Sequence, residues 1–183
     1  MGIESSGEDT NLFVIKIDGD GNLLWEKSYK NYGYDEGLQI THTSDNGSII
    51  CAGNTGNYNI YSTRILKIDH EGNTQWDKSF LWSNSSTFGL SIAQTPDGGY
   101  LFSGGNGYSP INGLLVKLDP EGVLIWKKEF KPDYLDYVWV LVDLKLTKDG
   151  GVIMIGHKSS VWGYGEKELG MWLMKSDLSG NIE

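Results

Sequence analysis

The chain has 183 residues, of which 39% are hydrophobic and 21% charged, and its formal net charge is −9. This balance is typical of a folded domain and excludes a disordered chain, and the acidic charge disfavours nucleic acid and anionic membranes as partners. No apolar run reaches the roughly 20 residues of a membrane helix, and this segment holds no signal-peptide core.

One sequence motif recurs along the chain at a nearly fixed interval. It runs from Ile17 to Trp25, and it returns from Ile68 to Trp76 and from Leu118 to Trp126. A fourth copy opens at Ser176-Asp177. The aspartates of the four copies are 51, 50 and 58 residues apart. A period of this length indicates one supersecondary unit used several times.

Each unit divides into four short β-prone segments. In one unit these are residues 90–95, 100–104, 113–118 and 123–130. Tight turns join the first segment to the second and the third to the fourth, through Asp97-Gly98-Gly99 and the Asp-x-x-Gly sequence that begins at Asp119. An aspartate that caps its own turn, followed by a glycine suited to positive φ, predicts a hairpin. The sequence therefore predicts an all-β fold of four-stranded antiparallel meanders, like the blades of a β-propeller.

The predicted units are a partial blade at 11–30, full blades at 37–80 and 89–130, and a partial blade at 138–183. We interpret residues 1–183 as one repeat region of about three and a half blades, whereas closed propellers hold about four to eight. The expectation is therefore an incomplete ring. The chain would be a fragment of a longer one, or copies of it would self-associate to close the ring.

The recurrent tryptophans and the single cysteine carry further structural predictions. Trp25, Trp76 and Trp126 recur at one place in each unit, which indicates packing between neighbouring blades. Cys51 lies in the apolar run 48–52 and is expected to be a small buried residue.

The segment Lys-Ile-Asp-x-x-Gly-Asn-x-x-Trp, followed by a Thr-x-Asp-Gly-Gly turn, resembles the blades of bacterial and archaeal cell-surface β-propellers. These blades are related to the PQQ-type, or quinoprotein-like, tryptophan repeats. The resemblance extends over the whole chain, at Lys16-Ile17-Asp18, Lys67-Ile68-Asp69, Lys117-Leu118-Asp119 and Lys175-Ser176-Asp177. It implies a secreted or surface-exposed protein. Nothing in the sequence matches the residues with which quinoprotein enzymes bind their cofactor, so no cofactor is expected.

Metal and catalytic sites find little support in the sequence. The run from Asp18 to Asn22 imitates part of a calcium loop, but only its first aspartate recurs in the other copies, which favours turn capping. His42, His70 and His157 occupy different positions of the repeat and show no metal-ligand spacing. We therefore expect no metal and no catalytic residue.

Aromatic residues gather in the longer loops, opposite the tight turns. Eight of the ten tyrosines lie there: Tyr32, Tyr34, Tyr58, Tyr61, Tyr108, Tyr134, Tyr137 and Tyr164. Local packing over the blade ends is one interpretation, and a carbohydrate- or protein-binding face is the other. The candidate ligand-binding residues are Tyr32, Tyr34, Trp82, Tyr134, Tyr137 and Trp162.

Two classes of function follow from these observations. The first is a non-catalytic propeller module that acts as a scaffold, an adhesion surface or a ligand-binding surface. The second is a fragment of a propeller enzyme, quinoprotein-like or glycan-active, whose catalytic residues lie outside this segment. The sequence favours the first class because it shows no nucleophile–base pair.

Overall fold

The computed structural model is built from antiparallel strands, and the residues it describes form no helix. It describes residues 2–6, 9–31, 33–55, 60–82, 86–107, 111–131, 137–160 and 170–182. The strands are β1 (Gly2–Ser6), β2 (Asp9–Ile17), β3 (Leu23–Tyr29), β4 (Tyr34–His42), β5 (Ser48–Thr55), β6 (Tyr61–Ile68), β7 (Thr74–Phe80), β8 (Thr87–Gln94), β9 (Tyr100–Gly107), β10 (Ile111–Leu118), β11 (Leu124–Phe130), β12 (Tyr137–Leu146), β13 (Val152–Ser160) and β14 (Gly170–Ser176). The predicted all-β class is confirmed.

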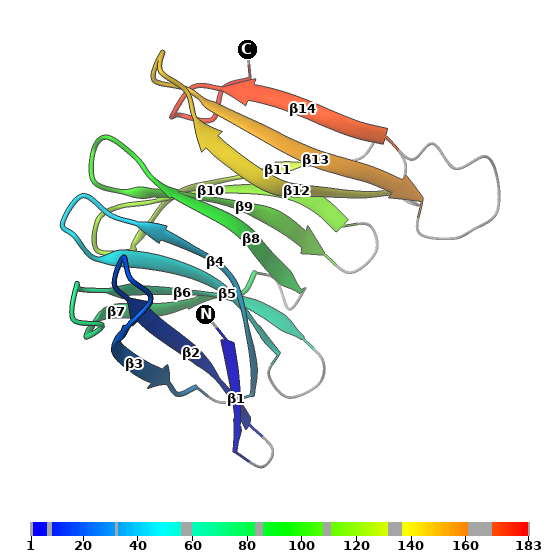
Figure 1. Cartoon of the computed structure of the whole chain (residues 1–183). Coiled ribbons are helices and arrows are strands. Elements are labelled where there is room, and N and C mark those ends of the chain that lie inside the picture. The colour runs from blue at the N-terminus through cyan, green and yellow to red at the C-terminus, as the bar shows by residue number, and fades with distance from the viewer. Residues whose placement is uncertain are drawn as a thin grey trace.

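The strands fall into four groups, which we call repeats 1 to 4. Repeat 2 is the antiparallel meander β4-β5-β6-β7, and repeat 3 is the meander β8-β9-β10-β11. Repeat 1 holds β1–β3 and repeat 4 holds β12–β14. Short parallel contacts, β2 with β4 and β10 with β12, join the repeats in pairs. Figure 1 shows the groups following one another from the N-terminal to the C-terminal end of the molecule.

β1 was not predicted. The predicted first unit begins at residue 11, and the structure adds β1 before it, which pairs with β2 from Gly2↔Phe13 to Ser6↔Asp9. The sequence of β1, Gly-Ile-Glu-Ser-Ser, carries no apolar alternation. Its strand conformation therefore follows from pairing with β2 rather than from local pattern.

The tight turns form as the sequence predicts, and they gather at one end of the molecule (the left of Figure 1). Asp18, Asp69, Asp119 and Asp177 each accept a hydrogen bond from the backbone N–H four residues later, at 2.7–2.8 Å. The glycine of each turn has positive φ, between 73° and 87°. Only glycine adopts this conformation without strain, so the Asp-x-x-Gly pattern is explained by turn geometry.

A lysine at the end of the third strand links the two hairpins of a repeat through an ion pair. Lys67 Nζ lies 2.7 Å from Asp45 in repeat 2, and Lys117 Nζ lies 2.7 Å from Asp97 in repeat 3. Lys175 and Asp149 make the same pair at 2.6 Å in repeat 4. Partial burial alone would raise the pKa of Asp97, but hydrogen bonds from Lys117, Thr95 and the Gly99 N–H outweigh it and lower that pKa to about 2.

These lysine–aspartate pairs make the stability of the fold depend on acid pH. A carboxyl whose pKa is lower in the folded state stabilises the fold above its unfolded pKa, and that contribution is lost as the pH falls through the folded pKa. For Asp97 the interval runs from 3.8 down to about 2. The Asp97→Asn variant is expected to unfold at lower urea concentration than the wild type at pH 7. The difference should shrink as the pH falls through this interval; a difference that stays constant would contradict the role of the pair.

The recurrent tryptophans contact the turn of the following repeat. Trp25 Nε1 donates to His70 O at 3.3 Å, and Trp76 Nε1 donates to Pro120 O at 3.0 Å. Their rings lie so close to the turn glycines that a Cβ on Gly72 or Gly122 would be 2.9 Å from the indole. The predicted packing between repeats is therefore confirmed. All three tryptophans are half-buried, because each lies on the last strand of its repeat.

Apolar clusters fill the three spaces between successive repeats. The first joins Val14 of repeat 1 to Leu66 of repeat 2, the second joins Ile65 to Val116, and the third joins Leu115 to Leu141. Each of these side chains is at most 2% exposed. Cys51 lies in the second cluster with no exposed surface, as expected, and burial raises its pKa to about 12. The third strands β6 and β10 are consequently buried on both faces.

Candidate functional site

The structure describes only part of the predicted ligand-binding set. Tyr34 begins β4 and is 48% exposed, and Trp82 follows β7. Tyr137 begins β12, but its side chain is not among the parts that the structure describes. Three further members of the set lie outside the described residues: Tyr32, Tyr134 and Trp162. The spatial relation between Tyr34 and the other predicted members therefore stays a prediction.

Trp82 is placed against the core rather than in open solvent. Its ring stacks on Phe102 at 6.4 Å between centroids with an interplanar angle of 17°, and it lies 5.8 Å from the ring of Phe80. The ammonium of Lys127 covers it, with Nζ 5.0 Å from the ring centroid. These contacts favour the packing interpretation for Trp82.

An exposed pair of tyrosines crosses repeat 2 at the end opposite the tight turns. Tyr34 pairs with Thr55, and Thr55 pairs with Tyr61 on the next strand. Directly opposed residues share one face of a sheet, so the three side chains form a row, with the tyrosines separated by two strand spacings, roughly 10 Å. Tyr61 is 42% exposed, and its ring lies 5.2 Å from that of Phe88 in repeat 3. We call Tyr34, Thr55 and Tyr61 the tyrosine row.

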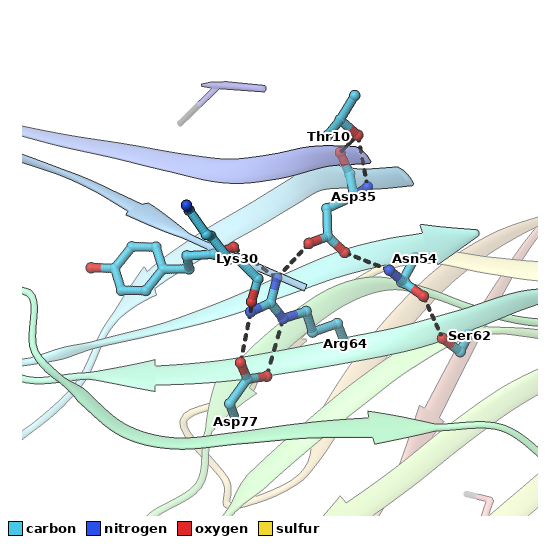
Figure 2. Close-up of polar contacts among 8 residues, drawn as sticks. Thr10, Lys30, Asp35, Asn54, Ser62, Arg64 and Asp77 are labelled. Carbon is cyan, nitrogen blue, oxygen red and sulfur yellow. Dashed lines mark hydrogen bonds and ion pairs between the residues drawn. The ribbon is translucent and has the colours of Figure 1, made fainter. Parts of the chain in front are cut away.

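A buried ionic network lies on the opposite face of the same strands (Figure 2). Arg64, 1% exposed, forms an ion pair with Asp35, which has no exposed side-chain surface. It also binds Asp77 through two bonds, of 3.1 Å from Nε and 2.7 Å from Nη2. Asn54 donates to the second oxygen of Asp35 at 2.8 Å, and Thr10 of repeat 1 accepts from the Asp35 backbone N–H at 2.9 Å.

The network satisfies every donor of the guanidinium. Besides the two carboxylates, Arg64 donates to the backbone carbonyls of Tyr29 at 3.1 Å and Lys30 at 3.3 Å. All five N–H groups of the arginine are thereby used. Burial alone would lower the pKa of Arg64, but Asp77 and Asp35 raise it, so the guanidinium is charged. The arrangement connects repeat 1 to repeat 2 and leaves no arginine donor for a substrate.

Repeat 3 has different residues at the positions of Arg64 and Asp35. Leu114 stands where repeat 2 has Arg64, and Thr87 stands where it has Asp35, as the strand pairings show. The carboxylate of this repeat is Glu129 on the last strand, which accepts from Asn106 at 3.0 Å and Asn112 at 3.1 Å. The buried ion pair is therefore peculiar to repeat 2 within the described part of the chain.

A groove lies between repeats 1 and 2, at the end of the tight turns. This groove, of about 280 Å³, is lined by His42 and His70 together with Trp25 and Ile40. The sequence gives no sign that the two histidines lie close together, because they occupy different positions of the repeat. Ile40 is 43% exposed, whereas its equivalent Ile92 in repeat 3 is 1% exposed. Ile92 is covered by β4, from which Gln39 and Thr41 bond its backbone, and the described part of repeat 1 holds no counterpart of β4.

In the described ranges, no three His, Cys, Asp or Glu side chains are grouped so that they could hold a metal ion. Nor does any described helix have the length and apolar character to cross a membrane.

Comparison with known proteins gives little beyond this. No family model matches the chain, and no curated protein matches it. Among solved structures, the chain is similar to a protein of unknown function from Bacteroides caccae, at 11% identity and a TM-score of 0.49. The similarity covers 94% of this chain and 71% of that one.

Proposed function

We propose that the chain is a non-catalytic module of β-propeller blades, related to the PQQ-type repeats and belonging to a secreted or surface protein, and that it binds an oligosaccharide at the tyrosine row. The propeller interpretation is supported by the two complete four-stranded meanders and by the apolar clusters between successive repeats. Propeller blades are sheets of this kind, packed face to face.

The exposed tyrosine row carries the binding proposal. Tyr34 and Tyr61 present flat apolar rings with hydroxyl groups, and Thr55 between them supplies another hydroxyl. Such rings suit the apolar faces and hydroxyls of sugars, and each loses little side-chain freedom on contact. The buried network of Arg64, Asp35 and Asp77 holds β4 and β6 in place beneath the row. A preorganised surface loses less free energy on binding.

A glycan array followed by calorimetric titration of the tightest-binding oligosaccharide tests the proposal. The double variant Tyr34→Ala/Tyr61→Ala is expected to bind at least about fivefold more weakly, since each aromatic contact contributes about 0.5–1.5 kcal/mol. Its melting temperature should change little. The matched double variant with phenylalanine keeps the rings and should retain most of the affinity.

Either of two results would contradict this function. One is the absence of any glycan that binds the wild type on the array. The other is equal affinity of the wild type and the double alanine variant, which would place the ligand elsewhere. A preference for proteins over glycans in a parallel pull-down would favour the adhesion interpretation instead.

A further inference from the structure

The last repeat exposes apolar residues at positions that repeats 2 and 3 bury. Leu173 on β14 is the equivalent of Ile65 in repeat 2 and Leu115 in repeat 3, which have no exposed surface, yet Leu173 is 66% exposed. Met171 on the same face is 80% exposed. Ile153 and Ile155 on β13 continue this surface and are half-buried. We call these four residues the C-terminal face.

The first repeat exposes the complementary set. Ile15 and Ile17 on β2 are 46% and 56% exposed. Their equivalents in repeat 2, Leu66 and Ile68, are at most 1% exposed because they pack against repeat 1. We call Ile15 and Ile17 the N-terminal face.

The two faces are the two halves of an interface that the chain already forms internally. Between repeats 2 and 3, Ile49, Cys51 and Ile65 pack against Val116 and Leu118. The equivalents of the first three are Ile153, Ile155 and Leu173, and the equivalents of the last two are Ile15 and Ile17. The two exposed faces therefore carry equivalents of residues that share one buried cluster inside the chain.

The turn glycines show independently that one side of repeat 1 is uncovered. Gly72, Gly122 and Gly180 are each covered by the tryptophan of the preceding repeat. Gly21, in the same turn of repeat 1, has no atom within 4 Å of where its Cβ would stand. The turn of repeat 1 is therefore open on the side that a tryptophan covers in the other three repeats.

We propose that a second copy of the chain docks head to tail, its N-terminal face against the C-terminal face of the first. The contact would repeat the part of the internal interfaces that the second and third strands form, since the described part of repeat 1 has no counterpart of β8. Because it joins two different surfaces, it either closes into a ring or continues into a longer assembly. This association does not depend on oligosaccharide binding, and its faces do not include the tyrosine row.

Light scattering of two single-face variants tests the proposal. The first variant, Leu173→Asp, blocks the C-terminal face, and the second, Ile15→Asp, blocks the N-terminal face. Both positions are already exposed, so neither change should alter the melting temperature of the monomer. The expected result is that the wild-type mass rises with concentration to at least that of a dimer, while each variant alone stays a monomer.

Mixing the two variants in equal amounts should restore a dimer, because each supplies the face that the other lacks. The control Ile125→Asp, at a position 55% exposed on β11, should associate like the wild type. A wild type that stays monomeric at all concentrations would overturn the proposal. So would a single variant that still dimerises alone, because that result requires pairing of like faces.

Discussion

Replacing Arg64 with leucine is expected to lower the free energy of unfolding by about 3–5 kcal/mol, the usual cost of removing one partner from a buried ion pair. The change leaves the carboxylate of Asp35 with no cation and no exposed surface. Burial already raises the pKa of Asp35, against the hydrogen bond from Asn54 and the charge of Arg64. Without the arginine, Asp35 must be protonated or hydrated at neutral pH, and either process costs free energy.

The chain itself supplies the control for this experiment. Repeat 3 folds with leucine and threonine at the two positions, as Leu114 and Thr87. The double variant Arg64→Leu/Asp35→Thr should therefore recover most of the lost stability, since buried ion pairs are often replaced by apolar groups at little cost. Urea unfolding at pH 7 measures the free energy of unfolding of the single and the double variant. Equal instability of the single and double variants would show that the charge of Asp35 is not the cause.

Replacing Gly122 with alanine is expected to destabilise the protein by about 2–5 kcal/mol, through two effects. The positive φ of 73° costs an alanine about 1–2 kcal/mol. In addition, the new methyl would stand 2.9 Å from the ring of Trp76, and forcing atoms into a packed contact costs about 1–3 kcal/mol.

Gly21→Ala separates the two effects. Gly21 occupies the same turn of repeat 1 with a φ of 87°, but no atom lies within 4 Å of its Cβ position. Its substitution should cost only the backbone term of about 1–2 kcal/mol. A loss at Gly122 no greater than at Gly21 in thermal unfolding would contradict the inferred contact between the tryptophan and the turn.

The features that the sequence predicts correctly are local. The Asp-x-x-Gly turns form because the capping aspartate and the glycine lie within four residues of each other, so their spacing is visible in the sequence. The apolar run around Cys51 likewise predicts its burial in the core. The recurrence of one phrase then predicts that the same hairpins are repeated.

The features that the sequence does not reveal depend on distant residues. Arg64 meets Asp35, which lies 29 residues earlier, and Asp77, which lies 13 later, and the repeat comparison offers no arginine in the other copies. His42 and His70 line one groove because it forms from residues of repeats 1 and 2 that are far apart in the sequence. Of the predicted binding residues, Tyr34 is exposed in the structure. Its neighbour in the tyrosine row, Tyr61, was recognised only as one of many loop tyrosines.

Amide chemical-shift mapping with a bound oligosaccharide tests the central claim, that the module binds its ligand at the end opposite the tight turns. The account predicts that the largest shifts occur at Tyr34, Thr55 and Tyr61. Shifts centred on the turn from Asp18 to Asn22, or on the groove that contains His42 and His70, would contradict it.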